Sequence, residues 1–193
     1  MSDPLPRDPG RWLRPCIYVT LIIIAVVAAG LILRVSSTMS GRSPKFEARI
    51  AATSLTAALQ MYYSEYGHWP DFTGNGLFLD EQRQARLLRV LMGKDEANNP
   101  SKIVFFEARI AIESFWKYRS GIHPKTDTLL DPWGQPYRIA LDLTGIGTIA
   151  NFYPDDGPIH STVIVWSLGK DGQQGSPANP HTFKGSDDVT SWQ

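Results

Sequence analysis

Residues 44–66 read PKFEARIAATSLTAALQMYYSEY and decide the fold of the chain. Apolar side chains recur in this stretch with helical spacing, and charged or polar side chains occupy much of the remainder. Ser43-Pro44 resembles an N-cap followed by proline at the first helical position, and Gly67 and Pro70 mark the end. The pattern predicts an amphipathic helix that packs on a partner surface through an apolar stripe. The stripe consists of Phe46, Ile50, Leu55, Leu59, Tyr62 and Tyr66.

The chain before this helix contains one strongly apolar run. Residues 16–33 read CIYVTLIIIAVVAAGLIL, and they carry no charge between Arg14 and Arg34. A run of about 18 apolar residues is long enough to cross a bilayer, and it is longer than the core of a usual secretory signal. We therefore predict a cytoplasmic tail over 1–14, a transmembrane helix over 15–35 and a globular domain over 36–193. Basic residues lie on both sides of the run, so charge alone does not decide its orientation.

The chain after the 44–66 helix contains further helical patterns and then β-rich ones. Asp80–Met92 is predicted to be a short helix, capped by Asp80, with Leu87, Leu88 and Leu91 turned inward. The segment 103–118 begins with IVFF, which is typical of a strand, but it continues with helix formers at helical spacing. We expect a short helix there.

Three β-rich runs follow, over residues 135–141, 148–153 and 162–168. Their connections are too short for a crossover helix, which favours an antiparallel sheet over about 135–168. Residues 169–185 are rich in glycine, proline, asparagine and glutamine, and they predict a long loop. The expected fold class is α+β, with a helix on a small antiparallel sheet and a long C-terminal loop.

Composition excludes several classes of function. The 193 residues include 19 Lys+Arg and 19 Asp+Glu, and a neutral chain lacks the basic field of most nucleic-acid-binding proteins. The single cysteine, Cys16, cannot form an internal disulfide or a cysteine-based zinc site. No nucleophile, zinc-protease, phosphate-loop or dinucleotide motif is present, so we expect a protein that is not an enzyme.

The C-terminal loop carries an acidic cluster. Asp171 lies near its start, and Asp187-Asp188 closes it. Calcium takes about six to eight oxygen ligands and often mixes carboxylates with backbone carbonyls. The loop does not match the EF-hand pattern, so spacing alone favours an ordinary turn with solvated carboxylates over a calcium site. Asp155-Asp156-Gly157 is interpreted as a turn.

Three short motifs, the third of them in two parts, together resemble the G-type major pseudopilins of type II secretion systems. They are Met61–Pro70 (MYYSEYGHWP), Asp131–Tyr137 (DPWGQPY), Ser167–Gly172 (SLGKDG) and Asp187–Trp192 (DDVTSW). The resemblance implies a pilin-like fold, with a membrane helix, a stalk helix over about 44–66, a small antiparallel sheet and a calcium-binding loop over 167–192. It also implies that Asp171 and Asp187 are carboxylate ligands, that Asp188 is a further contact, and that Leu168 and Gln173 offer backbone carbonyls.

The resemblance implies a non-enzymatic subunit of a type II secretion or type IV pilus-like apparatus that contributes to protein export. Such a subunit crosses the inner membrane once and holds its globular domain in the periplasm. Its partners would be the membrane, other pilin-like subunits, inner-membrane components of the secretion system and copies of itself.

The N-terminal sequence departs from the family pattern. Pilin precursors carry a glycine at the cleavage site and a glutamate shortly after it, and residues 14–21 (RPCIYVTL) contain neither. A permanently membrane-anchored pilin-like binding or scaffold protein, which is not processed and does not polymerise, is therefore the alternative. A cell-envelope enzyme that uses the carboxylates of the acidic loop is a weaker third option.

Overall fold

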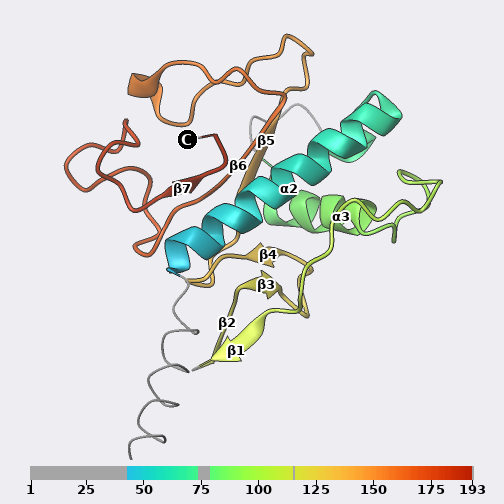
Figure 1. The fold of residues 1–193 in the computed structure, drawn as a ribbon, viewed down its shortest axis with the longest axis horizontal. Coiled ribbons are helices and arrows are strands. Elements are labelled where there is room, and N and C mark those ends of the chain that lie inside the picture. The colour runs from blue at the N-terminus through green and yellow to red at the C-terminus, as the bar shows by residue number, and fades with distance from the viewer. Residues whose placement is uncertain (1–42, 74–78, 115, 193) are drawn as a thin grey trace, which may run out of the picture. The chain divides into compact units, whose positions relative to one another are not determined.

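The computed structural model describes residues 43–73, 79–114 and 116–192 (Figure 1). The tail and the transmembrane helix predicted within residues 1–35 lie outside these ranges. Within the ranges, no helix combines the length and the apolar character needed to cross a bilayer. The chain divides into two units, 1–42 and 43–193, and the fold described below is that of the second unit.

Helix α2, Pro44–Tyr66, confirms the helix predicted from residues 44–66. It ends where Gly67 adopts a φ of 73° and donates its N–H to the Tyr63 carbonyl, a conformation that glycine adopts without strain. Ser43 stands at the N-cap position, but its side chain makes no capping hydrogen bond. The helix packs on β6 and β7 (Figure 1).

The buried face of α2 differs from the predicted stripe at its beginning. Phe46 and Ile50 are 54% and 45% exposed, so their predicted inward orientation is wrong. Small side chains occupy the same turns on the packed face, where they let the helix backbone lie close to the sheet. The buried residues of the helix are Ala48, Ala52, Leu55, Ala58, Leu59 and Tyr62.

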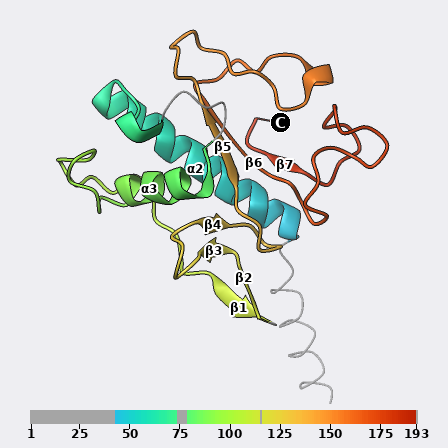
Figure 2. The same cartoon turned by 180° about the vertical axis from the view of Figure 1, so that it is seen from behind.

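The main sheet is antiparallel, with the order β5-β6-β7, and it confirms an α+β fold with small antiparallel sheets. Its strands are β5 Arg138–Leu141, β6 Val163–Ser167 and β7 Val189–Thr190. Every residue of β6 is buried, because α2 covers one face of the sheet and loops cover the other (Figure 2). Val163 and Val165 join the α2 core, whereas Ile164 and Trp166 join a second apolar cluster.

The strand expected over residues 148–153 is absent from the described chain, apart from an isolated bridge between Ile149 and Ile159. The chain turns out of the sheet directly after β5. There, the Asp142 carboxylate accepts the backbone N–H groups of Thr144, Gly145 and Gly147. These bonds stabilise a turn and compete with a strand over the following residues.

Helix α3, Glu81–Leu91, confirms the predicted second helix. The Asp80 carboxylate accepts the Arg83 N–H at 2.8 Å, as an N-cap should. Leu87, Leu88 and Leu91 are fully buried, as predicted. A short 3-10 turn, η2 Asp71–Thr73, lies between α2 and α3.

The short helix expected within residues 103–118 is wrong. Residues 103–109 form neither helix nor strand, and a hairpin follows with strands β1 Ile112–Ser114 and β2 Lys117–Arg119. Phe105 and Phe106 both donate their N–H groups to the Leu91 carbonyl at the end of α3. These contacts draw the segment across α3 and override its helical spacing. A second small ladder, β3 Gly121–Ile122 with β4 Leu129–Leu130, follows the hairpin.

Candidate calcium site in the C-terminal loop

The C-terminal loop is anchored at the end of β6 by a buried hydroxyl. Ser167 Oγ donates to Asp131 Oδ2 at 2.5 Å and accepts the Gly169 N–H at 3.1 Å. The other oxygen of Asp131 accepts the N–H groups of Trp133 and Gln135. Burial raises the pKa of Asp131, and these hydrogen bonds only partly oppose the effect. The turn over 131–137 thereby holds the start of the loop.

Asp187 closes the loop on its own beginning. Its Oδ2 accepts the N–H of Lys170 at 2.6 Å and the N–H of Asp171 at 3.3 Å. The backbone of Gly169 lies against the same carboxyl group, and a Cβ at Gly169 would lie 2.6 Å from Asp187 Cγ. A glycine at this position therefore permits the contact between the two ends of the loop.

Asp188 is more deeply buried, with only 2% of its surface exposed. Its Oδ2 accepts the Tyr153 hydroxyl at 2.5 Å and the Gly175 N–H at 2.7 Å. Burial raises the pKa of Asp188, and the negative charges of Asp187 and Asp171 raise it further. Burial and the hydrogen bond to Asp188 also raise the pKa of Tyr153.

Within the described part of the chain, the second oxygen of each of these two carboxylates accepts no hydrogen bond. Asp187 Oδ1 and Asp188 Oδ1 are both buried, and no donor within the described part of the chain reaches them. A buried carboxylate oxygen without a donor is costly, and a bound cation removes the cost. The donor set is all oxygen, which suits calcium.

Side chains alone do not complete a metal site. Over residues 43–73, 79–114 and 116–192, no three His, Cys, Asp or Glu side chains are grouped closely enough to hold an ion. Calcium at this place would therefore need backbone carbonyls or water as further ligands.

The remaining residues of the predicted site lie at the beginning of the loop. Leu168 is buried and packs in the second apolar cluster. Asp171 is exposed, and its Oδ1 accepts the Gln173 N–H at 2.9 Å in a local turn. Asp188 therefore lies buried and Asp187 half-buried where the loop closes, whereas Asp171 and Gln173 lie at its exposed edge.

Sequence reasoning missed the contacts that hold the loop from outside. Besides Tyr153, the 3-10 turn η3 Pro154–Asp156 binds the far part of the loop. Asp156 accepts the hydroxyl of Thr182 and the N–H of Phe183, both at 2.7 Å. The sequence does show the Asp-Asp-Gly turn, but spacing does not reveal that its partners lie 26 and 27 residues later.

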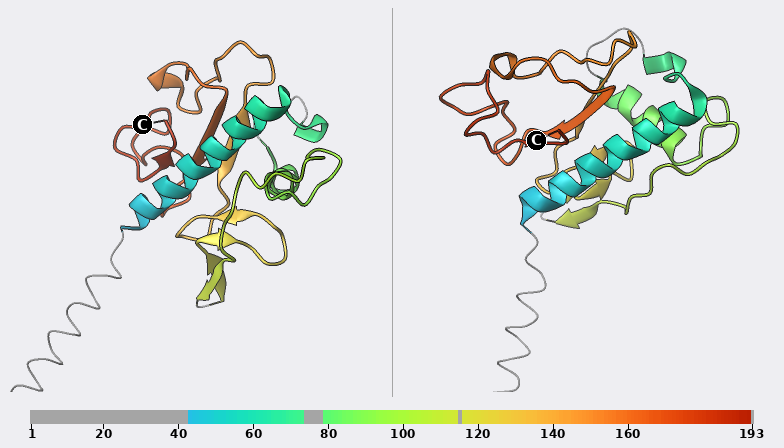
Figure 3. Two further views of the ribbon diagram at one scale, coloured as in Figure 1. Left: turned by 45° about the vertical axis from the view of Figure 1, so that its right-hand side comes forward. Right: turned by 45° about the horizontal axis from the view of Figure 1, so that its top comes forward.

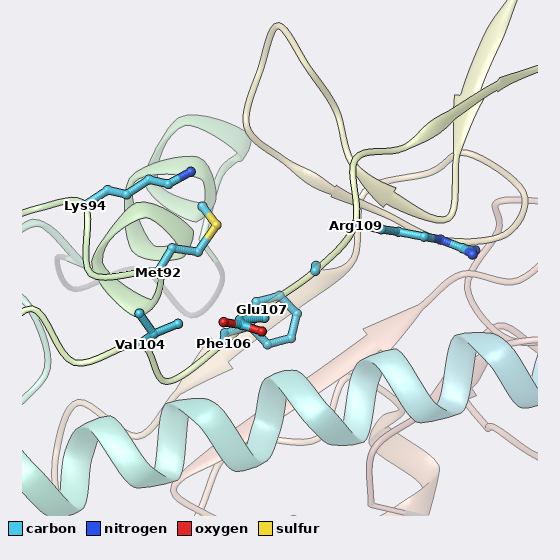
Figure 4. A pocket seen from close by; sticks show the side chains of 7 residues that line it. Met92, Lys94, Val104, Phe106, Glu107 and Arg109 are labelled. Atoms are coloured by element: carbon cyan, nitrogen blue, oxygen red, sulfur yellow. The ribbon is translucent and has the colours of Figure 1, made fainter.

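A separate hollow of about 530 Å³ lies beside the end of α3 (Figure 4). Met92, Val104 and Phe106 supply its apolar lining, and Lys94, Glu107 and Arg109 lie at its rim. The three charged side chains belong to exposed residues, and they do not converge on one point in Figure 4. The hollow lacks the convergent polar groups of a ligand site.

Comparisons of the chain with models of protein families, with curated proteins and with solved structures found no match.

Proposed function

We propose that this protein is a non-enzymatic, pilin-like subunit of a type II secretion or type IV pilus-like apparatus. The observation that carries the proposal is the outer face of α2. Residues 50–64 contain no charged side chain, although part of this stretch is exposed along one side of the helix. A surface helix normally carries charges on its solvent face, so an uncharged face favours contact with other subunits. The exposed positions are Ile50, Thr53, Ser54, Ala57, Gln60, Met61 and Ser64.

The apolar run of residues 16–33 supports the proposed location. A span there would hold the chain in the inner membrane, with the globular domain on the periplasmic side. In that arrangement α2 follows the span after a short connection, and assembled subunits could pack through both segments.

Calcium is the proposed cofactor of the C-terminal loop. Asp187 and Asp188 would hold the ion with their unpartnered oxygens, and Asp171, Leu168 and Gln173 would contribute from the beginning of the loop. The ion would neutralise carboxylates whose burial is otherwise unfavourable. A loop stabilised in this way would present one constant surface to neighbouring subunits.

Intact mass tests whether the chain is processed like a pilin. The full chain is produced in a host with an active prepilin peptidase, extracted from membranes and weighed. A loss that matches cleavage close to Cys16 supports assembly into a filament. A full-length mass from the membrane fraction supports the second candidate, a permanently anchored scaffold, which the absence of a glycine and a glutamate in residues 14–21 favours.

A charge placed on the outer face of α2 tests assembly itself. Ala57→Glu introduces a carboxylate in the middle of the uncharged face, and Glu65→Lys is a matched control outside it. We expect cross-linked oligomers of the full chain in membranes to be lost in Ala57→Glu and kept in Glu65→Lys. Equal oligomers in both variants would contradict the role of this face.

A further inference from the structure

Most of the exposed large apolar side chains in the described chain lie in two segments, the start of α2 and residues 104–116, and the others are Met61, Leu143 and Ile146. The most exposed is Trp116, at 96%, and Ile110 and Ile112 are 62% and 52% exposed. Tryptophan buries a large apolar area when it is covered, so a nearly fully exposed tryptophan indicates a surface that acquires a partner. The exposed residues in the two segments are Phe46, Ile50, Val104, Ile110, Ile112 and Trp116.

The β1–β2 hairpin presents these apolar groups together with cations. Trp116 directly precedes β2 and has a φ of 67°. Ile112 stands opposite Arg119, and Ser114 stands opposite Lys117. Within the described ranges, neither Lys117 nor Arg119 forms an ion pair. Glu113 also lies in the hairpin, where it accepts the Tyr118 hydroxyl, so residues 112–119 carry two cations and one anion. The hairpin therefore combines an exposed tryptophan, an exposed isoleucine and a net positive charge.

The hairpin is tied to the first turn of α2. Arg109, just before β1, contacts Glu47 Oε1 at 2.5 Å through Nη2 and the Ser120 carbonyl at 2.8 Å through Nε. Figure 3 shows the hairpin and the start of α2 at the same end of the fold in both views. The hairpin thus lies close to the point where the chain enters the domain from its N-terminal side.

We propose that the β1–β2 hairpin lies on the surface of the membrane, with Trp116 at the level of the lipid headgroups. This inference rests on the proposed membrane anchor. Residues 34–42 separate the predicted apolar run from Ser43, and nine residues span at most about 30 Å when fully extended. The start of α2 and the hairpin tied to it are therefore kept near the bilayer.

The chemistry of the hairpin favours a lipid surface over a second protein. Tryptophan is enriched where membranes meet water, and lysine and arginine beside it bind anionic headgroups. Tryptophan and arginine are also common in protein–protein interfaces, but lysine is depleted from the buried centre of such interfaces. Because Lys117 and Arg119 outnumber Glu113, the hairpin has a net positive charge beside Trp116. It therefore fits an anionic membrane, and it would orient the domain relative to the bilayer.

The test uses the full chain reconstituted into vesicles of phosphatidylcholine and phosphatidylglycerol, with and without brominated acyl chains that quench tryptophan fluorescence. The emission of Trp116 is obtained by subtracting the emission spectrum of Trp116→Phe from that of wild type. The emission of Trp133 is obtained in the same way with Trp133→Phe. We expect brominated lipid to reduce the Trp116 emission about twofold or more and to leave the Trp133 emission unchanged. Lys117→Gln combined with Arg119→Gln should weaken the quenching of Trp116, since each cation adds to lipid attraction.

Three other results would overturn the inference, and they have different meanings. If Trp116 is quenched no more than Trp133 while alkaline carbonate leaves the chain in the membrane, the hairpin does not dock and the anchor stands. If carbonate releases the chain, the proposed anchor fails together with the docking. If Trp116 becomes shielded from aqueous iodide in detergent as the protein concentration rises, a second copy of the chain covers it.

Discussion

The α2–sheet core and the C-terminal loop are stabilised by different kinds of interaction. The core buries leucine, valine and tyrosine side chains between α2, α3 and one face of the β5-β6-β7 sheet. The loop is held mainly by carboxylates that accept backbone N–H groups, as at Asp187 and Asp188. Apolar side chains neither titrate nor bind a cation, whereas buried carboxylates do both. Changes in calcium or pH should therefore alter the stability of the loop, whereas a change in side-chain volume should alter the stability of the core.

The largest expected effect is in the core. Leu59 is fully buried between α2 and the sheet, and Leu59→Ala should lower the free energy of unfolding by about 2–5 kcal/mol. Urea unfolding of fragment 43–193, which contains both apolar clusters, measures the loss with and without calcium. Met61→Ala, on the exposed face of the same helix, is the control and should change the value by less than about 0.5 kcal/mol. If the stability lost in Leu59→Ala depended on calcium, the core and the loop would not be stabilised independently.

Calcium removal should affect the loop and spare the core. At about 100 times its Kd, calcium adds about 2.7 kcal/mol to the free energy of unfolding, and a chelator should remove this gain. Asp188→Asn should abolish the calcium response, because the amide lacks the charge that binds the ion. Without calcium, the same variant should be at least as stable as wild type, since the buried charge is gone.

Thermal unfolding of fragment 43–193 with added calcium or chelator measures both effects. Asp155→Asn, in the neighbouring turn, is the matched control and should retain the calcium response. The same thermal midpoint for the wild type in calcium and in chelator would show that the loop holds no structural calcium.

Substitutions at two glycines of the loop separate the effect of a steric contact from the effect of backbone strain. Gly169 and Gly185 both have positive φ values, of 67° and 84°, but only Gly169 lies against another group, the Asp187 carboxyl. Gly185→Ala should cost about 1 kcal/mol through backbone strain alone. Gly169→Ala should cost more and should weaken calcium binding, because its Cβ displaces Asp187. Calorimetric titration with calcium compares the two, and equal affinities would contradict a ligand role for Asp187.

The smallest expected effect is a pH dependence at the base of the loop. Burial raises the pKa of Asp131, so between its ordinary value of about 3.9 and the raised value the folded chain keeps a proton that the unfolded chain has lost. The stability contributed by this group is thus complete below about pH 3.9 and is lost as pH rises through the folded pKa. Asp131→Asn should reduce the fall in unfolding free energy from about pH 4 to pH 7.

Asp142→Asn is the comparison variant, because the shift in the pKa of Asp142 has the opposite sign to that of Asp131. Burial alone would raise the pKa of Asp142, but hydrogen bonds from Thr144, Gly147 and Gly145 together lower it. Its contribution is lost as pH falls through the lowered pKa, so the variant should lose less stability on acidification than wild type. Urea unfolding at a series of pH values measures both, and parallel slopes in wild type and Asp131→Asn would show that Asp131 does not titrate as described.

Local patterns predicted α2 and α3 well because their signals lie within the elements themselves. The Asp80 cap, the positions of Leu87, Leu88 and Leu91, and the glycine stop at Gly67 all appear in the structure as expected. The strand prediction over residues 162–168 also holds, since β6 is a continuous apolar run.

The errors arose where distant partners decide the conformation. Residues 103–118 have helical spacing, but the Leu91 carbonyl binds two of their N–H groups and draws the segment out of a helix. The orientation of Phe46 and Ile50 depended on which face of α2 the sheet selected, and alanines on the other face allowed the closer approach.

The α+β class, both helices with their ends and the acidic residues that close the loop follow from local sequence patterns, because capping, periodicity and turn chemistry act within a few residues. The bond from Tyr153 to Asp188, the bond from Ser167 to Asp131 and the exposure of Trp116 follow from tertiary packing. Each of these outcomes depends on residues far apart in the chain meeting, or failing to meet, once the core has packed. The spacing of residues along the sequence does not reveal which of them come close together in the folded protein.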